Sequence, residues 1–257
     1  TEAQSVYKMI IATIFYMLFG GVVLFVYKIV SVRSMEAERI TIERIAAFVT
    51  AAEGDVAAIG RGIARQNLVQ CLAFVAEMTT GPNERFGIIM KYYHIESYMI
   101  SRIFKSKNLY ERAYLLSLFA RLPISMLAAL RVEPLVRAES DRVSFSALMC
   151  LFAASSIKGV ATLARTPHRL SRRDVAEMLS VINRGCCPLP YTPLLMSDNY
   201  NLQLFGIYLV RRFGITESRG EIVCIVKNQG SELRDDALSA LASFGDFMAE
   251  RGERNVI

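Results

Sequence analysis

The chain has 257 residues, of which 53% are hydrophobic and 21% are charged, and its formal net charge is +6 at pH 7. It contains only two histidines and an odd number of cysteines, five, which argues against a zinc enzyme and against a framework of disulfides. The sequence also lacks a P-loop, a nucleophile elbow and a paired-histidine helix motif. We therefore expect a protein that is not an enzyme and that binds neither a cofactor nor a metal.

The first predicted element is a transmembrane helix at residues 9–30, preceded by a short tail at residues 1–8. Residues 9–27 carry no charge, and as a helix they are about 28 Å long, close to the ~30 Å hydrocarbon core of a bilayer. A cleavable signal peptide is the alternative, but the apolar run exceeds a usual signal sequence and no small-residue cleavage site follows it.

The orientation of this helix is predicted from the charges that flank it. Lys8 is the only basic residue before the run, whereas several follow it closely: Lys28, Arg33, Arg39 and Arg44. The positive-inside bias therefore predicts a single-pass protein of the inner membrane, with the tail outside and the C-terminal domain in the cytoplasm.

Residues 31–257 are predicted to form an all-α domain, because strand signals are rare and apolar residues recur at helical spacing. The clearest helix follows Ser231, a good N-cap residue, and we expect Asp236 on its solvent-facing side. Its predicted buried face consists of Leu233, Ala237, Ala240, Leu241, Phe244 and Met248. Similar helices are expected after Asp198 and after Asn108.

A small residue recurs in the middle of these helices about every thirty residues, at Ala113, Ala147, Ala176, Gly206 and Ala237. Small residues let neighbouring helices pack closely, and this period is typical of helix–turn–helix units that stack on one another. Chance registration in an alanine-rich helical chain is the alternative.

The stretches 197–215 and 221–247 resemble a pair of HEAT or HEAT-like repeats. In that family the second helix follows the pattern L-R-x-x-A-L-x-A-L, which matches residues 233–241, LRDDALSAL. The resemblance implies an α-solenoid of helix pairs that holds another protein in a groove. A single span followed by such repeats also resembles bacterial accessory subunits, which implies a membrane glycosyltransferase of polysaccharide synthesis or export as the partner.

These features predict a membrane-anchored, non-catalytic scaffold that docks a membrane protein or membrane-associated complex. One alternative is a HEAT-like lyase or cofactor-binding enzyme, since some family members act on bilin chromophores. Another is a signalling adaptor that binds a receiver domain or a cyclic nucleotide.

The strongest candidate contact is the basic segment 165–173, whose arginines are Arg165, Arg169, Arg172 and Arg173. Arg211 and Arg212 hold a similar position near a repeat end, so the six are expected to form one basic strip. A guanidinium binds carboxylates and phosphates bidentately, which suits an acidic partner segment or anionic lipid. A merely solvated surface is the alternative, and the membrane anchor argues against nucleic acid.

The aromatic segment 91–110 supplies a second set of candidate contacts. Tyr92, Ile95, Met99 and Ile103 follow helical spacing and are expected to share a buried face. Tyr93 and Tyr110 then remain as exposed partner-binding residues, because tyrosine is favoured at interfaces. Cys186 and Cys187 with His168 form a weaker metal candidate, since adjacent cysteines rarely satisfy one tetrahedral ion.

Overall fold

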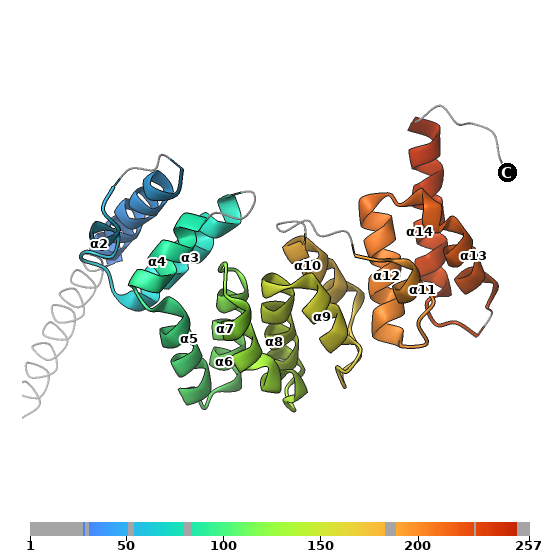
Figure 1. Ribbon diagram of the computed structural model, residues 1–257, viewed down its shortest axis with the longest axis horizontal. Coiled ribbons are helices and arrows are strands. Elements are labelled where there is room, and N and C mark those ends of the chain that lie inside the picture. Colours follow the sequence, from blue (N-terminus) through green and yellow to red (C-terminus); the bar gives the residue numbers. More distant parts are fainter. Residues whose placement is uncertain are drawn as a thin grey trace, which may run out of the picture. The chain divides into compact units, whose positions relative to one another are not determined.

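The structure is a computed structural model that describes residues 28, 31–50, 54–79, 84–182, 189–228 and 230–250. All regular elements in these ranges are helical and none is a strand, so the predicted all-α class is confirmed (Figure 1). The transmembrane helix predicted at 9–30 lies outside the described residues, apart from Lys28. Within the described ranges, no helix combines the length and the apolar character that a bilayer crossing requires.

The chain divides into two compact units at the bond between Val75 and Ala76. The first unit contains a helical segment at residues 31–50, the short helix α2 and most of α3. Asp55 caps α2 by accepting a hydrogen bond from the backbone N–H of Ala57. The bounds of the two labelled helices are Val56–Ile59 for α2 and Arg65–Met78 for α3.

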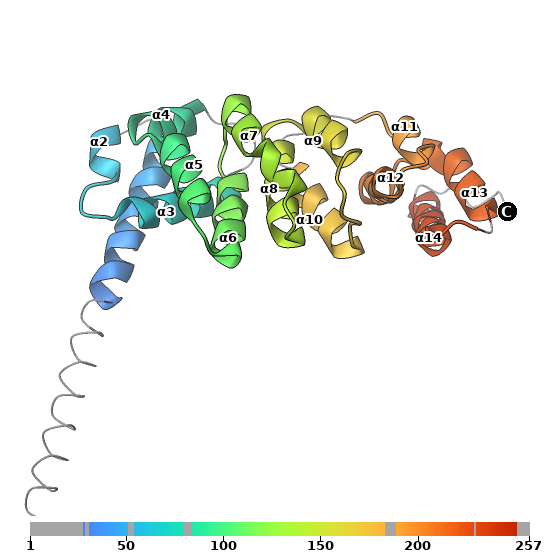
Figure 2. The same ribbon diagram turned by 90° about the horizontal axis from the view of Figure 1, so that it is seen from below.

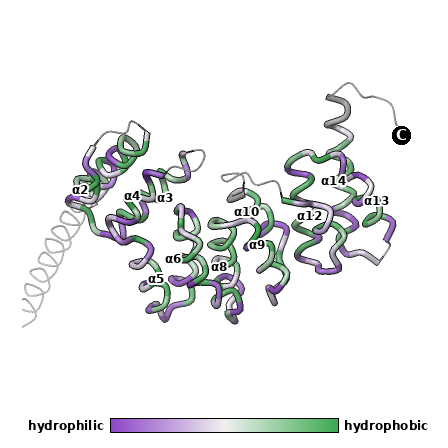
Figure 3. The backbone as a smooth tube through the Cα atoms, viewed as in Figure 1, coloured by the Kyte–Doolittle hydropathy of each residue, from purple (hydrophilic) through white to green (hydrophobic). Residues whose placement is uncertain are grey.

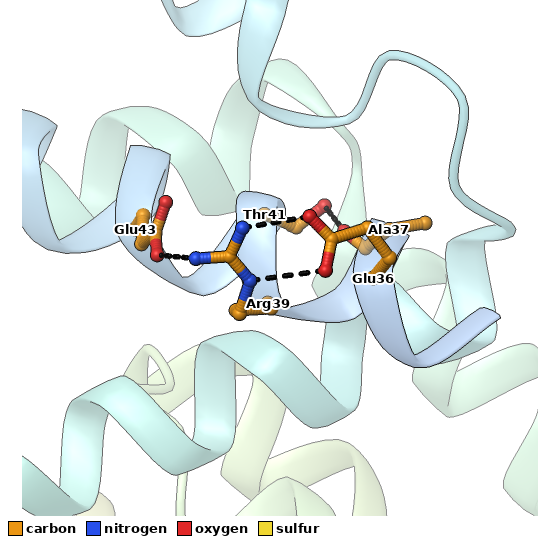
Figure 4. Close-up of polar contacts among 5 residues, drawn as sticks. All are labelled: Glu36, Ala37, Arg39, Thr41 and Glu43. Atoms are coloured by element: carbon orange, nitrogen blue, oxygen red, sulfur yellow. Dashed lines mark hydrogen bonds and ion pairs between the residues drawn. The ribbon is translucent and has the colours of Figure 1, made fainter. Parts of the chain in front are cut away.

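The segment 31–50 has one charged face and one buried face. On the charged face, Arg39 lies between Glu36 and Glu43 and contacts both carboxylates at 2.6 Å (Figure 4). The hydrogen bond from Arg39 lowers the pKa of Glu36. On the side toward α3, the Asn67 amide donates to Glu38 at 2.8 Å, and the buried residues are Ile45 and Val49.

The second unit contains, beyond the end of α3, a series of further helices. Their bounds are α4 Glu84–Tyr92, α5 Ile95–Lys105, α6 Leu109–Ala120, α7 Met126–Val132, η1 Glu133–Arg137, α8 Asp141–Ala154, α9 Ser156–Leu163, α10 Arg172–Ile182, α11 Thr192–Leu195, α12 Tyr200–Phe213, η2 Thr216–Ser218, α13 Arg219–Lys227 and α14 Arg234–Glu250. Side-chain caps fix several of the starts. Asn108 and Asn199, for example, each accept two backbone N–H groups at the beginning of α6 and α12.

Successive helices of this unit pack on their neighbours. Helix α6 packs on α8, α8 on α10, α10 on α12, and α12 on α14, so these five form one row. Helices α5, α7, α9, α11 and α13 each pack on a member of that row (Figures 1 and 2). Hydrophobic and hydrophilic residues alternate along each helix, as expected for helices with one face in such a stack (Figure 3). This arrangement of helix pairs is compatible with an α-solenoid.

The small residues predicted to recur along the chain all lie on this row of helices. Ala113, Ala147 and Ala237 are buried, and Gly206 lies so close to α11 that an added Cβ would be 2.9 Å from the Cβ of Leu194. The prediction that Ala176 lies where neighbouring helices pack closely is wrong, because this residue is exposed.

The register of α10 explains the exposure of Ala176. The hydroxyl of Ser171 caps the helix by accepting the backbone N–H of Asp174 at 3.2 Å. This start places Val175, Met178 and Leu179 on the buried face, and Ala176 therefore points outward.

The predicted face of α14 is largely confirmed. Leu233, Ala237, Ala240 and Phe244 are buried, whereas Leu241 is half-buried and the side chain of Met248 lies outside the described part. The expectation that Asp236 faces solvent is wrong, since its side chain is only 7% exposed. Neighbouring α10 and α12 cover it and supply polar partners, which are Arg172 and Tyr208.

Candidate partner-binding site

Two of the predicted partner-binding arginines are engaged within the protein. The Arg169 guanidinium lies 3.7 Å from the ring centroid of Tyr200 on α12 and forms an ion pair with Glu232, just before α14. Arg172, at the start of α10, contacts Asp236 on α14 at 2.9 Å. These two arginines therefore connect three successive helices of the row.

Around Asp236 the contacts form a small polar network. The Tyr208 hydroxyl donates to Asp236 at 3.2 Å, and burial together with this carboxylate raises the pKa of Tyr208. The hydrogen bond to Asp236 raises the pKa of Arg172.

The remaining arginines of the predicted strip are exposed. The side chains of Arg173 and Arg212 have neither an ion pair nor a hydrogen bond to another described residue, and Arg165 lies in the turn after α9. The structure thus separates the strip into arginines that join helices and arginines that are available to a partner. Whether the strip binds anything stays a prediction.

His168 has a structural role in the same turn. Its Nδ1 lies 2.6 Å from a carboxylate oxygen of Asp141, and its Nε2 lies 2.9 Å from the carbonyl oxygen of Ala138. These contacts tie the turn before α10 to the start of α8. Cys186 and Cys187 lie outside the described residues, and the described ranges contain no cluster of three metal-ligating side chains.

The segment 91–110 is not one helix. Helix α4 ends at Tyr92, and His94 adopts a left-handed conformation with φ = 51° before α5 begins. The predicted burial of Ile95, Met99 and Ile103 is confirmed, but that of Tyr92 is wrong, because this residue belongs to the preceding helix and is 51% exposed. Tyr93 is half-buried, and its ring lies 5.0 Å from that of Tyr92 in an edge-to-face contact. Of the two neighbouring tyrosines, Tyr93 is therefore less accessible than Tyr92.

Tyr110, the other predicted tyrosine, is 72% exposed and lines a groove of about 470 Å³. Side chains from α6, α8 and α10 line this groove, with Glu77 from the end of α3. Small and hydroxyl-bearing residues are among them: Ala113, Ser117, Ala120, Ser146 and Ser180. Met149 and a set of aromatic and charged residues complete the lining: Tyr110, Tyr114, Phe145, Arg121, Arg142 and Glu177.

The charges of the groove are balanced and partly paired. The Arg142 guanidinium lies 5.5 Å from the ring centroid of Tyr110, and Arg121 forms an ion pair with Glu77 at 3.4 Å. Exposed rings beside guanidinium and hydroxyl groups suit the binding of a peptide surface.

Sequence reasoning missed Tyr114, Phe145 and Arg142 as candidate residues. The signal was available in the caps, because α6 follows Asn108 and α8 follows Ser140. Counted from these caps, the lining residues of both helices occupy the same helical positions.

Comparisons with known proteins add no functional relative. No family model matches the sequence, and no curated protein matches it. Among solved structures, the crystal structure of an engineered protein, a Northeast Structural Genomics Consortium target, is 13% identical over 77% of this chain and 84% of that chain. Its TM-score of 0.27 is too low to support an argument about the fold.

Proposed function

We propose that this chain is a membrane-anchored, non-catalytic scaffold whose HEAT-like helical domain docks a partner protein. The observation that carries the proposal is the groove formed by α6, α8 and α10. Because three successive helices line it, one bound segment would contact several repeats at once, which is how helical repeat proteins use extended surfaces.

Two tyrosines are the main contacts in this proposal. Tyr110 is 72% and Tyr114 is 50% exposed, and both lie on the groove side of α6. Tyrosine offers a large rigid surface with little loss of side-chain entropy, and a few such residues dominate many interfaces. Arg142 beside Tyr110 adds a guanidinium for carboxylates or backbone carbonyls of the partner.

The membrane part of the proposal rests on the apolar segment 9–30 and on the basic residues that follow it. Confinement to the inner membrane would raise the effective concentration of the helical domain near any partner in the same bilayer, so a moderate affinity would suffice. On the family resemblance, the first partner to look for is a membrane glycosyltransferase of polysaccharide synthesis or export.

The proposal is tested by copurification of the tagged full chain from its own membranes in mild detergent. We expect a stable partner protein with the wild type and a loss of recovery of more than about tenfold with Tyr110→Ala/Tyr114→Ala. Tyr92→Ala is the matched control, since Tyr92 is 51% exposed but lies outside the groove.

The competing outcomes are distinct. Equal recovery with the double variant and with the control would rule out the groove as the docking site. Recovery of a bound pigment or nucleotide in place of a protein would exclude the scaffold role itself.

A further inference from the structure

A second recess, of about 360 Å³, lies between η1 and the end of α9 and shares no lining residue with the groove. Its lining combines apolar and basic side chains. The lining includes Leu130, Pro134, Val136, Thr162, Arg137 and Arg165. Leu130 is 38% exposed, whereas Val136 is buried against α8.

The backbone around the recess is held in place on both sides. The hydroxyl of Ser144 donates to the carbonyl oxygen of Val136, and His168 binds the carbonyl oxygen of Ala138, the residue after Arg137. On the α9 side, the hydroxyl of Thr166 donates to the carbonyl oxygen of Thr162 at 3.1 Å. The two arginines of the recess therefore project from segments whose positions are already fixed.

The charge inside the recess is positive. Its one acidic lining residue, Glu133, is neutralised by Lys158 at 3.0 Å. Arg137 and Arg165 are exposed, and within the described part of the chain neither guanidinium forms an ion pair or a hydrogen bond. Two guanidinium groups with no acidic partner among the described residues therefore line the recess together with apolar side chains.

We propose that this recess binds an acidic segment of the partner protein, with a carboxylate between Arg137 and Arg165 and an adjacent apolar side chain against Leu130 and Pro134. The planar guanidinium fork matches a carboxylate bidentately. The concave shape favours an inserted side chain over a flat bilayer surface. The identification of the occupant as a segment of the partner rests on the proposed scaffold function. The affinity of the recess for an acidic segment does not depend on that function.

The test uses the full chain in mild detergent and a fluorescent, capped peptide of alternating glutamate and leucine, followed by fluorescence anisotropy. The wild type is expected to bind it more weakly as salt increases, because the contact is ionic. Arg137→Gln/Arg165→Gln should weaken binding at least about tenfold, since each hydrogen bond to a charged group contributes a factor of that size. Arg131→Gln is the matched control, because Arg131 is exposed on α7 and does not line the recess.

Three results would overturn the inference: no binding to the wild type, equal binding of a peptide with glutamine in place of glutamate, or unchanged binding by the double variant. A fourth result would also overturn it: if dioctanoyl phosphatidylglycerol bound in a manner that depends on the two arginines and the peptide did not bind, the occupant would be a lipid. Tyr110→Ala/Tyr114→Ala should bind the peptide as the wild type does, so failure of the groove and failure of the recess are distinguishable.

Discussion

Asp235 and Asp236 are adjacent in the first turn of α14, yet the structure gives them different environments. Asp235 is exposed, whereas Asp236 is 7% exposed and contacts Arg172 and Tyr208. We predict that Asp236→Ala lowers the free energy of unfolding by about 1–3 kcal/mol, because the hydroxyl of the half-buried Tyr208 and the guanidinium of Arg172 lose a charged acceptor. Asp235→Ala should change it by less than about 0.5 kcal/mol.

The two variants share the position near the helix N-terminus, so the favourable interaction of an acid with the helix dipole is lost in both and largely cancels in the comparison. Urea unfolding of the full chain in mild detergent, followed by far-UV circular dichroism, gives the two midpoints. Adding Arg172→Gln to Asp236→Ala should have less effect than Arg172→Gln alone, because the partner is already missing. Identical midpoints for the two alanine variants would refute the assignment of Asp236 as a link between helices.

Two further predictions concern packing and pH. Gly159→Ala should destabilise the protein by about 1–2 kcal/mol despite the better helix propensity of alanine, because the new Cβ would lie 2.5 Å from Cγ of Phe152. Gly87→Ala, with nothing within 4 Å, should instead stabilise α4 by about 0.5–1 kcal/mol, and thermal melts compare the two. The hydrogen bond from Ser106 lowers the pKa of Glu111, so its stabilising effect is present above the ordinary carboxyl pKa and is lost as the pH falls toward the lowered value. Glu111→Gln should therefore be less stable than the wild type at pH 7, and urea midpoints should converge in strong acid.

Local sequence signals predicted the helices well. Apolar periodicity and polar caps act within one or two turns, so the buried faces of α5 and α14 could be derived without the fold. Ala176 shows the limit of this reasoning. Aligning small residues across helices ignored the Ser171 cap, and the cap decides which side of α10 faces its neighbours.

The break between α4 and α5 had no signal in the sequence. Neither glycine nor proline interrupts the segment at Tyr93 and His94, and a left-handed histidine is an uncommon conformation. A continuous helix was therefore the natural prediction, and it placed Tyr92 on the wrong face.

The roles of the arginines depend on contacts that are remote in sequence. Arg169 and Arg172 form ion pairs with Glu232 and Asp236, and helices α12 and α13 lie between these residues in the sequence. The local composition therefore showed a basic segment and gave no sign of the acidic residues that pair with it. The groove residues Tyr114 and Arg142 are likewise brought together by the packing of α6 on α8. The caps indicate which positions of the two helices are equivalent, but only the packing of the helices brings these residues together.

The division between engaged and available arginines constrains how a partner can be recognised. Reversing the charge at Arg172 would disturb the contact between α10 and α14, so a lost partner would not by itself prove a binding role for that residue. The adjacent Arg173 lacks such a contact within the described residues, and so does Arg165 at the recess. The stability of stacked repeats depends on the faces that they share. Replacing an arginine that contacts no neighbouring helix can therefore change the affinity for a partner without changing the fold. Arg165 and Arg173 are therefore the arginines of the basic segment at which a binding role can be separated from a structural one.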